Sequence, residues 1–215
     1  RDGHLFVADS DNRRIRRIDA FTGQIVTVAG DGGSTPYSGN PSEALQTSLL
    51  GLSDRGMAFD SRGALVFSQY YLWRLAPSPT DGLIKGRVGE GELISPILHC
   101  DLSPFPPCPR IPFGGDGLPA GQANGLLAGG LIVASDGSIV TIQGLRVRQA
   151  LAGDDGVVTG DDNGEIVRTI AGYEYDATST VFAGTGTAGD SPFTGDAFST
   201  NSSLAYPEGV LEDPR

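Results

Sequence analysis

The sequence predicts an all-β protein that is built from a repeated unit of short antiparallel strands. Three observations lead to this prediction. Glycine supplies 32 of the 215 residues, which is about twice its ordinary usage. Short apolar and β-branched runs alternate with turn-forming residues along the chain. The same succession of strands and turns also returns at several places, as in repeat architectures.

The first copy of the unit lies within residues 3–50. Its apolar run at 5–8 is followed at 9–12 by Asp, Ser and Asn, which favour tight turns because their side chains bond to nearby backbone. An Arg-rich segment punctuated by isoleucines predicts a second strand, and a Thr-Gly turn precedes a third strand at 25–29. This copy therefore predicts three strands joined by two turns.

The glycine and hairpin pattern of the first copy returns twice. Each occurrence has a glycine, one further residue, an apolar strand, a short turn and a strand that carries an arginine between apolar residues. The three occurrences are residues 2–18, 61–76 and 135–150, anchored by Gly3, Gly63 and Gly137. A glycine at this place supplies backbone conformations that other residues adopt only with strain.

Two further strands complete the unit. A short apolar strand precedes the anchoring glycine at 56–60, 130–134 and 208–213. A closing strand follows the hairpin at 22–32, 83–91, 163–172 and 179–186. Four short antiparallel strands per unit are typical of a β-propeller blade. For the third unit two closing strands compete, 166–171 and 180–183, and the sequence leaves both open.

The whole chain is thus interpreted as part of one propeller, residues 1–215. The blade units lie at about 1–48, 49–125 and 126–203, the start of a further blade at 204–215, and inserted loops at about 90–125 and 153–178. Blades bury apolar faces against neighbours on both sides. Three to four visible blades therefore predict further blades in the same chain.

The segments LFVADSDNRRIRRID and TGQIVTVAGDGG resemble the NHL repeat family. The resemblance is specific over residues 3–50 and fair over 51–90 and 126–150. It implies a six-bladed β-propeller, of which about three to four blades are visible. The second and third units have no counterparts of Asp9 and Asn12, so the family's turn is absent from them.

Cys100 and Cys108 lie in a proline-rich stretch, HCDLSPFPPCPRIPF. Two cysteines and the neighbouring His99 are too few for a structural zinc site. A local disulfide that closes this loop is the favoured interpretation, and reduced thiols are the alternative. A disulfide would indicate an oxidising compartment, and with it a secreted or cell-surface protein.

The net charge of −11 and the pI near 4.4 argue against nucleic acid as a partner, because an acidic surface repels phosphate. Some NHL propellers bind RNA, and the basic run of residues 13–17 is the segment that would serve such a role. Surface pairing with acidic neighbours is the preferred interpretation of that run. No stretch reaches the ~18 apolar residues of a membrane helix, so no membrane contact is expected from this segment.

One acidic stretch, GDDGVVTGDDNGE, is the candidate metal site. Its carboxylates are Asp154, Asp155, Asp161, Asp162 and Glu165. Calcium prefers such oxygens, but the spacing differs from that of an EF-hand loop. A solvated acidic hairpin is the alternative interpretation. Apart from this calcium possibility, no cofactor is expected.

The sequence contains few combinations of residues that would indicate a catalytic site. His4 and His99 are too few for a propeller lyase that holds a metal by several histidines, and no Ser-His-Asp or Cys-His order stands out. No catalytic residue is therefore assigned, and enzyme activity is left open with a leaning against it. The alternative to a binding module is a propeller hydrolase or lyase with a divalent ion in the central channel.

The function expected from the sequence is a non-catalytic binding or interaction module, the exposed propeller of a larger secreted or cell-surface protein. Its partner would be a protein or a small extracellular ligand. Loops on a rigid scaffold carry recognition, and the loops here are 31–48, 90–125 and 185–206. The aromatic residues expected to anchor a partner are Tyr37, Phe113, Phe193 and Tyr206.

Overall fold

The computed structural model describes most of the first two thirds of the chain and shorter pieces beyond. The described residues are 3–35, 41–52, 56–69, 71–98, 116–123, 128–143, 146–160, 164–172, 174–175, 182–183 and 210–213. Within these ranges the chain forms fourteen β-strands and two 3-10 helices of three residues each. The predicted all-β class is confirmed for this part of the protein.

The first sheet is a three-stranded antiparallel meander. Its strands are β1 (Leu5–Asp9), β2 (Arg14–Ile18) and β3 (Ile25–Ala29), in the order β1-β2-β3. The turn between β2 and β3 forms because the Asp19 carboxylate accepts the backbone N–H groups of Phe21 and Thr22. Gly23 completes this turn at φ 70°, a conformation that costs most other residues strain.

The second sheet has five strands in the order β4-β8-β7-β6-β5. The strands are β4 (Ser42–Glu43), β5 (Met57–Phe59), β6 (Leu65–Ser68), β7 (Leu72–Leu75) and β8 (Leu93–Leu98). The short β4 belongs to the connection from the first sheet, and the 3-10 helix η1 (Ala44–Gln46) follows it directly.

The third sheet has four strands in the order β12-β11-β10-β9. They are β9 (Ala128–Val133), β10 (Ile139–Gln143), β11 (Arg146–Ala150) and β12 (Val167–Gly172), preceded by the 3-10 helix η2 (Ala120–Gln122). Strand β12 pairs with β11, so of the two closing strands left open by the sequence it is the segment near 166–171 that joins this sheet. The other candidate contributes to β14 (Phe182–Ala183), which pairs with β13 (Glu174–Tyr175).

The hairpins β1–β2, β6–β7 and β10–β11 fall on the three repeated segments, but their registers differ. Arg16 lies opposite Val7, and Arg148 lies opposite Thr141. Arg74 instead lies opposite Val66, and Trp73 takes the equivalent place. A slip of one residue moves a side chain to the other face of a sheet. Arg74 of the second repeated segment therefore lies on the other face of its sheet from the one that Arg16 and Arg148 occupy in theirs.

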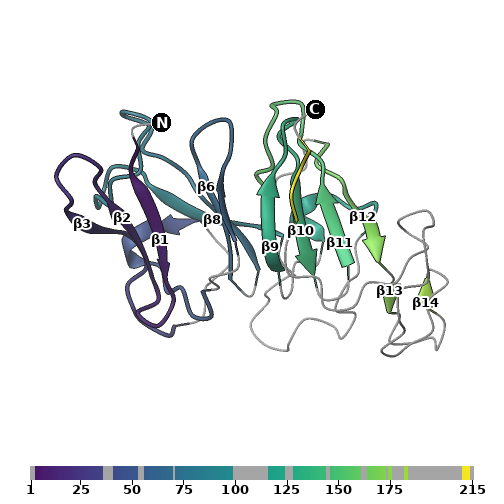
Figure 1. Ribbon diagram of the computed structural model, residues 1–215, viewed down its shortest axis with the longest axis horizontal. Helices are drawn as coiled ribbons and strands as arrows, with labels where there is room; N and C mark the ends of the chain where they lie inside the picture. The colour runs from purple at the N-terminus through teal and green to yellow at the C-terminus, as the bar shows by residue number, and fades with distance from the viewer. Residues whose placement is uncertain are drawn as a thin grey trace.

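The sheets follow one another in chain order and pack face against face (Figure 1). One core cluster joins the first and second sheets and contains Ile15, Val28, Phe67 and Trp73. A second cluster joins the second and third sheets and contains Val66, Leu98, Ile139 and Val167, among others. The second sheet therefore buries both of its faces.

Two glycine-containing loops pack neighbouring sheets closely together, one loop at each junction between sheets. A Cβ added to Gly86 would lie 2.0 Å from the Thr27 oxygen on β3, and one added to Gly160 would lie 2.8 Å from the Pro96 oxygen on β8. Both glycines also have positive φ. Only a residue without a side chain fits these two contacts, which recur at equivalent places.

Among the residues that the structure describes, no helix is long and apolar enough to cross a lipid bilayer.

Candidate functional site

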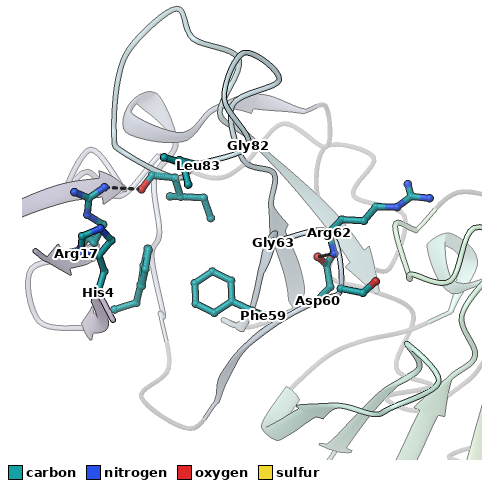
Figure 2. A pocket seen from close by; sticks show the side chains of 11 residues that line it. His4, Arg17, Phe59, Asp60, Arg62, Gly63, Gly82 and Leu83 are labelled. Atoms are coloured by element: carbon teal, nitrogen blue, oxygen red, sulfur yellow. Dashed lines mark hydrogen bonds between the residues drawn. The ribbon is translucent and has the colours of Figure 1, made fainter. Parts of the chain in front are cut away.

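A pocket of about 310 Å³ opens between the first and second sheets. Three segments line most of it: the start of β1, the turn from β5 to β6, and the turn that follows β7. Figure 2 shows these segments converging on Phe59, whose ring projects into the space. The lining residues are His4, Phe6, Arg17, Phe59, Asp60, Ser61, Arg62, Gly63, Gly82, Leu83 and Ile84.

The pocket results from two turns of the repeated unit. Gly63 closes the turn between β5 and β6 by donating its N–H to the Asp60 carbonyl. Gly82 does the same after β7 by donating to the Ser78 carbonyl. Both glycines have positive φ, which lets each turn reverse without a bulky side chain at this place. The space between the two turns stays open as a result.

One wall of the pocket is apolar. The rings of Phe6 and Phe59 meet edge to face, with centroids 5.0 Å apart, a geometry that aromatic pairs prefer. Phe59 is nevertheless 46% exposed and Leu83 is 40% exposed, whereas Ile84 behind them is buried. Two large apolar side chains thus face the pocket without being covered by the protein.

The polar wall of the pocket, formed by His4 and Arg17, carries hydrogen-bond donors and adjoins Phe6, which lies opposite Arg17 in the β1–β2 pair. Arg17 donates from Nη1 to the Ile84 carbonyl at 3.2 Å and from Nη2 to Asp19 at 3.1 Å. His4 accepts the backbone N–H of Ala20 on Nδ1 at 3.1 Å. A neutral imidazole that accepts on one nitrogen carries its proton on the other. His4 Nε2 is therefore a hydrogen-bond donor at this wall.

The remaining charged groups of the pocket are engaged by the protein. The Asp60 carboxylate accepts the N–H groups of Arg62 and Ala64 and is paired with the Arg74 guanidinium at 2.9 Å. Arg62 pairs with Asp155 of the third sheet's turn at 3.0 Å. Figure 2 shows the Arg62 side chain extending away from Phe59. Asp60 and Arg62 are therefore paired within the protein and are not expected to bind a ligand.

Asp19 holds the polar wall in place. The hydrogen bond from the backbone of Thr22 is the largest cause that lowers the pKa of Asp19 below its ordinary value, and the hydrogen bond from the Phe21 backbone acts in the same direction. Asp19 is therefore ionised at neutral pH. Its negative charge compensates that of Arg17.

The structure does not describe the residues that the sequence predicts as partner anchors. Tyr37, Phe113, Phe193 and Tyr206 lie outside the described residues, as do Cys100 and Cys108. These predictions therefore concern residues that lie outside the described part of the chain.

The predicted metal ligands are only partly described. Asp154 is exposed, and Asp155 accepts the Val157 N–H and pairs with Arg62. Asp161 and Asp162 lie outside the described residues. Over the described ranges no three His, Cys, Asp or Glu side chains gather as metal ligands would.

Glu165, which the sequence grouped with these carboxylates, is fully buried. Its carboxylate accepts the Thr159 N–H and hydroxyl and the Gly160 N–H. Glu92 occupies the equivalent place in the second sheet and accepts the N–H groups of Lys85, Gly86 and Arg87. These glutamates hold the glycine loops that lock one sheet onto the previous one.

The pocket itself was missed by the sequence analysis. His4 and Phe59 do lie near two of the repeated glycines, Gly3 and Gly63, so their place at the turns of the repeat was readable. Their meeting was not, because they come from different sheets. That both line one pocket depends on how the first two sheets pack.

Comparisons with known proteins support the fold only. No protein-family model matches the chain, and no curated protein matches it in sequence. Among solved structures, an auxiliary nutrient binding protein from Bacteroides thetaiotaomicron is similar with a TM-score of 0.56 and 12% identity. The similarity covers 99% of this chain and 41% of that protein. The chain therefore spans about two fifths of the length of this neighbour.

Proposed function

We propose that this chain is a segment of an NHL-type β-propeller that acts as a non-catalytic binding module, with the pocket between its first two sheets as a small-ligand site. The single observation that carries the proposal is the open pocket whose apolar wall, Phe59 and Leu83, the protein leaves uncovered. We place the module in a secreted or cell-surface protein, as a Cys100–Cys108 disulfide would require.

The propeller part of the proposal is supported by a comparison of equivalent residues. Leu65 and Phe67 follow Gly63 at the same spacing as Ile139 and Thr141 follow Gly137. All four are at most 1% exposed, and three of them belong to the clusters that join each sheet to the preceding one. The equivalents on β1 are Leu5 and Val7, at 62% and 42% exposed.

This face of the first sheet, defined by Leu5, Val7 and Ile25, has the same pattern that is buried in the other two sheets. In a propeller it would be covered by another blade of the same kind. The similar structure is longer than this chain, which covers 41% of it. A full-length protein of that size would have enough residues for a further blade.

We expect the double substitution Leu5→Ser and Val7→Ser to lower the free energy of unfolding of the full-length protein by about 3–6 kcal/mol, since a buried Leu or Val each contributes about 1.5–3 kcal/mol. Urea denaturation followed by fluorescence measures the change. The control is Phe21→Ser, because Phe21 is 82% exposed and should change stability by about 0.5 kcal/mol or less. A double variant as stable as this control would contradict the propeller.

The binding part of the proposal is supported by the pocket's composition and by the structural neighbour. Ligand sites are typically concave and mostly apolar, with a few polar groups that fix orientation, and the pocket has one wall of each kind. The neighbour is described as a nutrient-binding protein, and a small nutrient is accordingly our proposed class of ligand.

We expect at least one compound of a mixed small-nutrient library to bind the wild-type protein, with affinity about tenfold lower in Phe59→Ala, which corresponds to about 1.4 kcal/mol. Saturation-transfer NMR on the mixture detects binding, and titration of each hit gives the affinity. Leu118→Ala is the matched control, because Leu118 is a similarly exposed apolar residue, at 43%, outside the pocket. Hits that Phe59→Ala leaves unchanged would contradict this site.

A further inference from the structure

We infer that the pocket selects an uncharged, single-ring ligand with a flat apolar face and hydrogen-bond acceptors along one edge. This inference rests on the proposed function, since it names the class of ligand for the same site. It follows from three features of the pocket: its charge balance, its size with the placement of its walls, and the kind of polar group that it presents.

The first feature is that each charged side chain lining the pocket already has a counter-charge in the protein. Arg17 is paired with Asp19 at 3.1 Å, and Arg62 with Asp155 at 3.0 Å. Asp60 is paired with Arg74 at 2.9 Å. A charged ligand would lose its hydration in this space and find no uncompensated partner, which is unfavourable. A neutral ligand avoids that loss.

The second feature is size and placement of the walls. A pocket of about 310 Å³ is at the lower end of the range for small-molecule sites, about 300–1,000 Å³, so it suits one ring rather than two. Phe59 of the second sheet lies across from His4 and Arg17 of the first sheet (Figure 2). A ring that packs beside Phe6 and Phe59 would bring an edge near His4 and Arg17, because Phe6 is the cross-strand neighbour of Arg17.

The third feature is that the polar wall, His4 and Arg17, presents hydrogen-bond donors to the pocket. His4 Nε2 carries the proton because Nδ1 accepts from Ala20. Arg17 has only donor groups, and each of its terminal nitrogens makes one bond that the structure shows, to Ile84 and to Asp19. A terminal guanidinium nitrogen has two N–H groups, so each retains a second N–H. The ligand edge must therefore carry acceptors such as hydroxyl, ether or amide oxygens.

Two sources share this chemistry, a sugar ring and a neutral aromatic amide. Two matched pairs of probes separate charge from shape: glucose with glucuronate, and nicotinamide with nicotinate. In each pair the ring is kept and one member carries a carboxylate. Chemical-shift titration of each probe into ¹⁵N-labelled protein, and into Phe59→Ala, reports affinity and place together.

We expect the neutral member of at least one pair to bind about tenfold or more tightly than its carboxylate, a difference of about 1.4 kcal/mol. The shifts should concentrate at Phe59, Gly82 and Leu83, and in Phe59→Ala they should need about tenfold more ligand to reach the same size. The pair that binds identifies the source as a sugar or an aromatic ring. A second variant, His4→Phe, retains a ring beside Phe21 but lacks the donor, and it should weaken binding of the neutral probe.

Tighter binding of a carboxylate at the same residues would overturn the inference and leave the proposed site standing. Failure of all four probes, together with a nutrient hit that Phe59→Ala weakens, would also overturn the inference alone. Failure of the probes and of every nutrient at Phe59 would overturn both. If His4→Phe leaves the affinity of the neutral probe unchanged, His4 does not donate a hydrogen bond to the ligand, and this part of the inference is wrong.

Discussion

Replacing Glu92 by alanine is expected to lower the free energy of unfolding by about 3–4 kcal/mol, because hydrogen bonds to a charged group contribute about 1.5–3 kcal/mol each and are not additive. Glu92 is 1% exposed. Its carboxylate accepts the N–H groups of Lys85 at 2.6 Å, Gly86 at 2.7 Å and Arg87 at 3.3 Å. Alanine would leave these three donors without their acceptor and open a cavity.

The expected loss extends beyond the loop because the same residue joins two sheets. The Glu92 carbonyl accepts the N–H of Ala44, in the connection that arrives from the first sheet. The loop it holds contains Gly86, which packs on Thr27 of β3. Glu165 repeats the arrangement, since its carbonyl accepts the N–H of Ala120. Loosening this loop therefore weakens the contact between neighbouring sheets.

Urea denaturation of Glu92→Ala measures the effect, and Glu90→Ala is the matched control two residues away. The Glu90 side chain is paired with Arg87, whose side chain is 58% exposed, and such surface pairs contribute about 0–1 kcal/mol. Glu92→Gln should fall between the two, because an amide retains one acceptor oxygen. Equal losses for the alanine variants at 90 and 92 would refute the role given to Glu92.

Replacing Asp116 by alanine is the second change with a large expected effect. Arg148 has a fully buried side chain, and it donates to the Asp116 carboxylate at 2.7 and 3.1 Å and to Gln143 at 2.9 Å. Removing one partner of a buried ion pair costs about 3–5 kcal/mol. The Asp116 side chain is 32% exposed, so water relieves part of this, and we expect about 2–4 kcal/mol.

The same pair makes stability depend on pH. Burial alone would raise the pKa of Asp116, but hydrogen bonds from Thr169 and Arg148 and the positive charge of Arg148 outweigh it, and the net pKa lies below the ordinary value of 3.8. A carboxyl whose pKa is lower in the folded state stabilises the protein above the unfolded pKa. That stabilisation disappears as the pH falls through the folded pKa.

Urea midpoints measured from about pH 7 down to about pH 3 test both statements. The wild type should lose stability below the ordinary Asp range, and Asp116→Asn should lose less over the same interval. Asp81→Ala is the control, because the Asp81–Lys85 pair is partly exposed on both sides and should contribute about 0–1 kcal/mol. A pH profile that Asp116→Asn leaves unchanged would show that other carboxyls dominate.

The local parts of the fold could be predicted from the sequence. The glycines at 3, 63 and 137 and the turn residues beside them mark where each hairpin begins, because turn chemistry depends on neighbours in the chain. The all-β class and the three repeated hairpins follow from that. The propeller itself stays a proposal, which the buried equivalents of Leu5 and Val7 support.

The candidate site could not be predicted in the same way. Sequence reasoning looked for aromatic anchors in long loops and for carboxylates close together in the chain. The pocket instead combines His4 and Arg17 of the first sheet with Phe59 and Leu83 of the second. Glu165 suggested a metal ligand in sequence, but in the structure its carboxylate is buried and bonded to backbone.

What the sequence by itself determined about this protein is the strand class and the turns of the three repeated hairpins, since these depend on residues a few places apart. The closing strand predicted at 83–91 is wrong, because β8 (Leu93–Leu98), inside the predicted loop 90–125, pairs with β7 instead. Only the tertiary structure decided three other features: the register that places Trp73 where the other units have arginine, the closing strand β12, and the pocket. The physical reason is that each of these depends on side chains that meet across strands or sheets. Such contacts are set by packing and burial, which the order of residues in one segment does not encode alone.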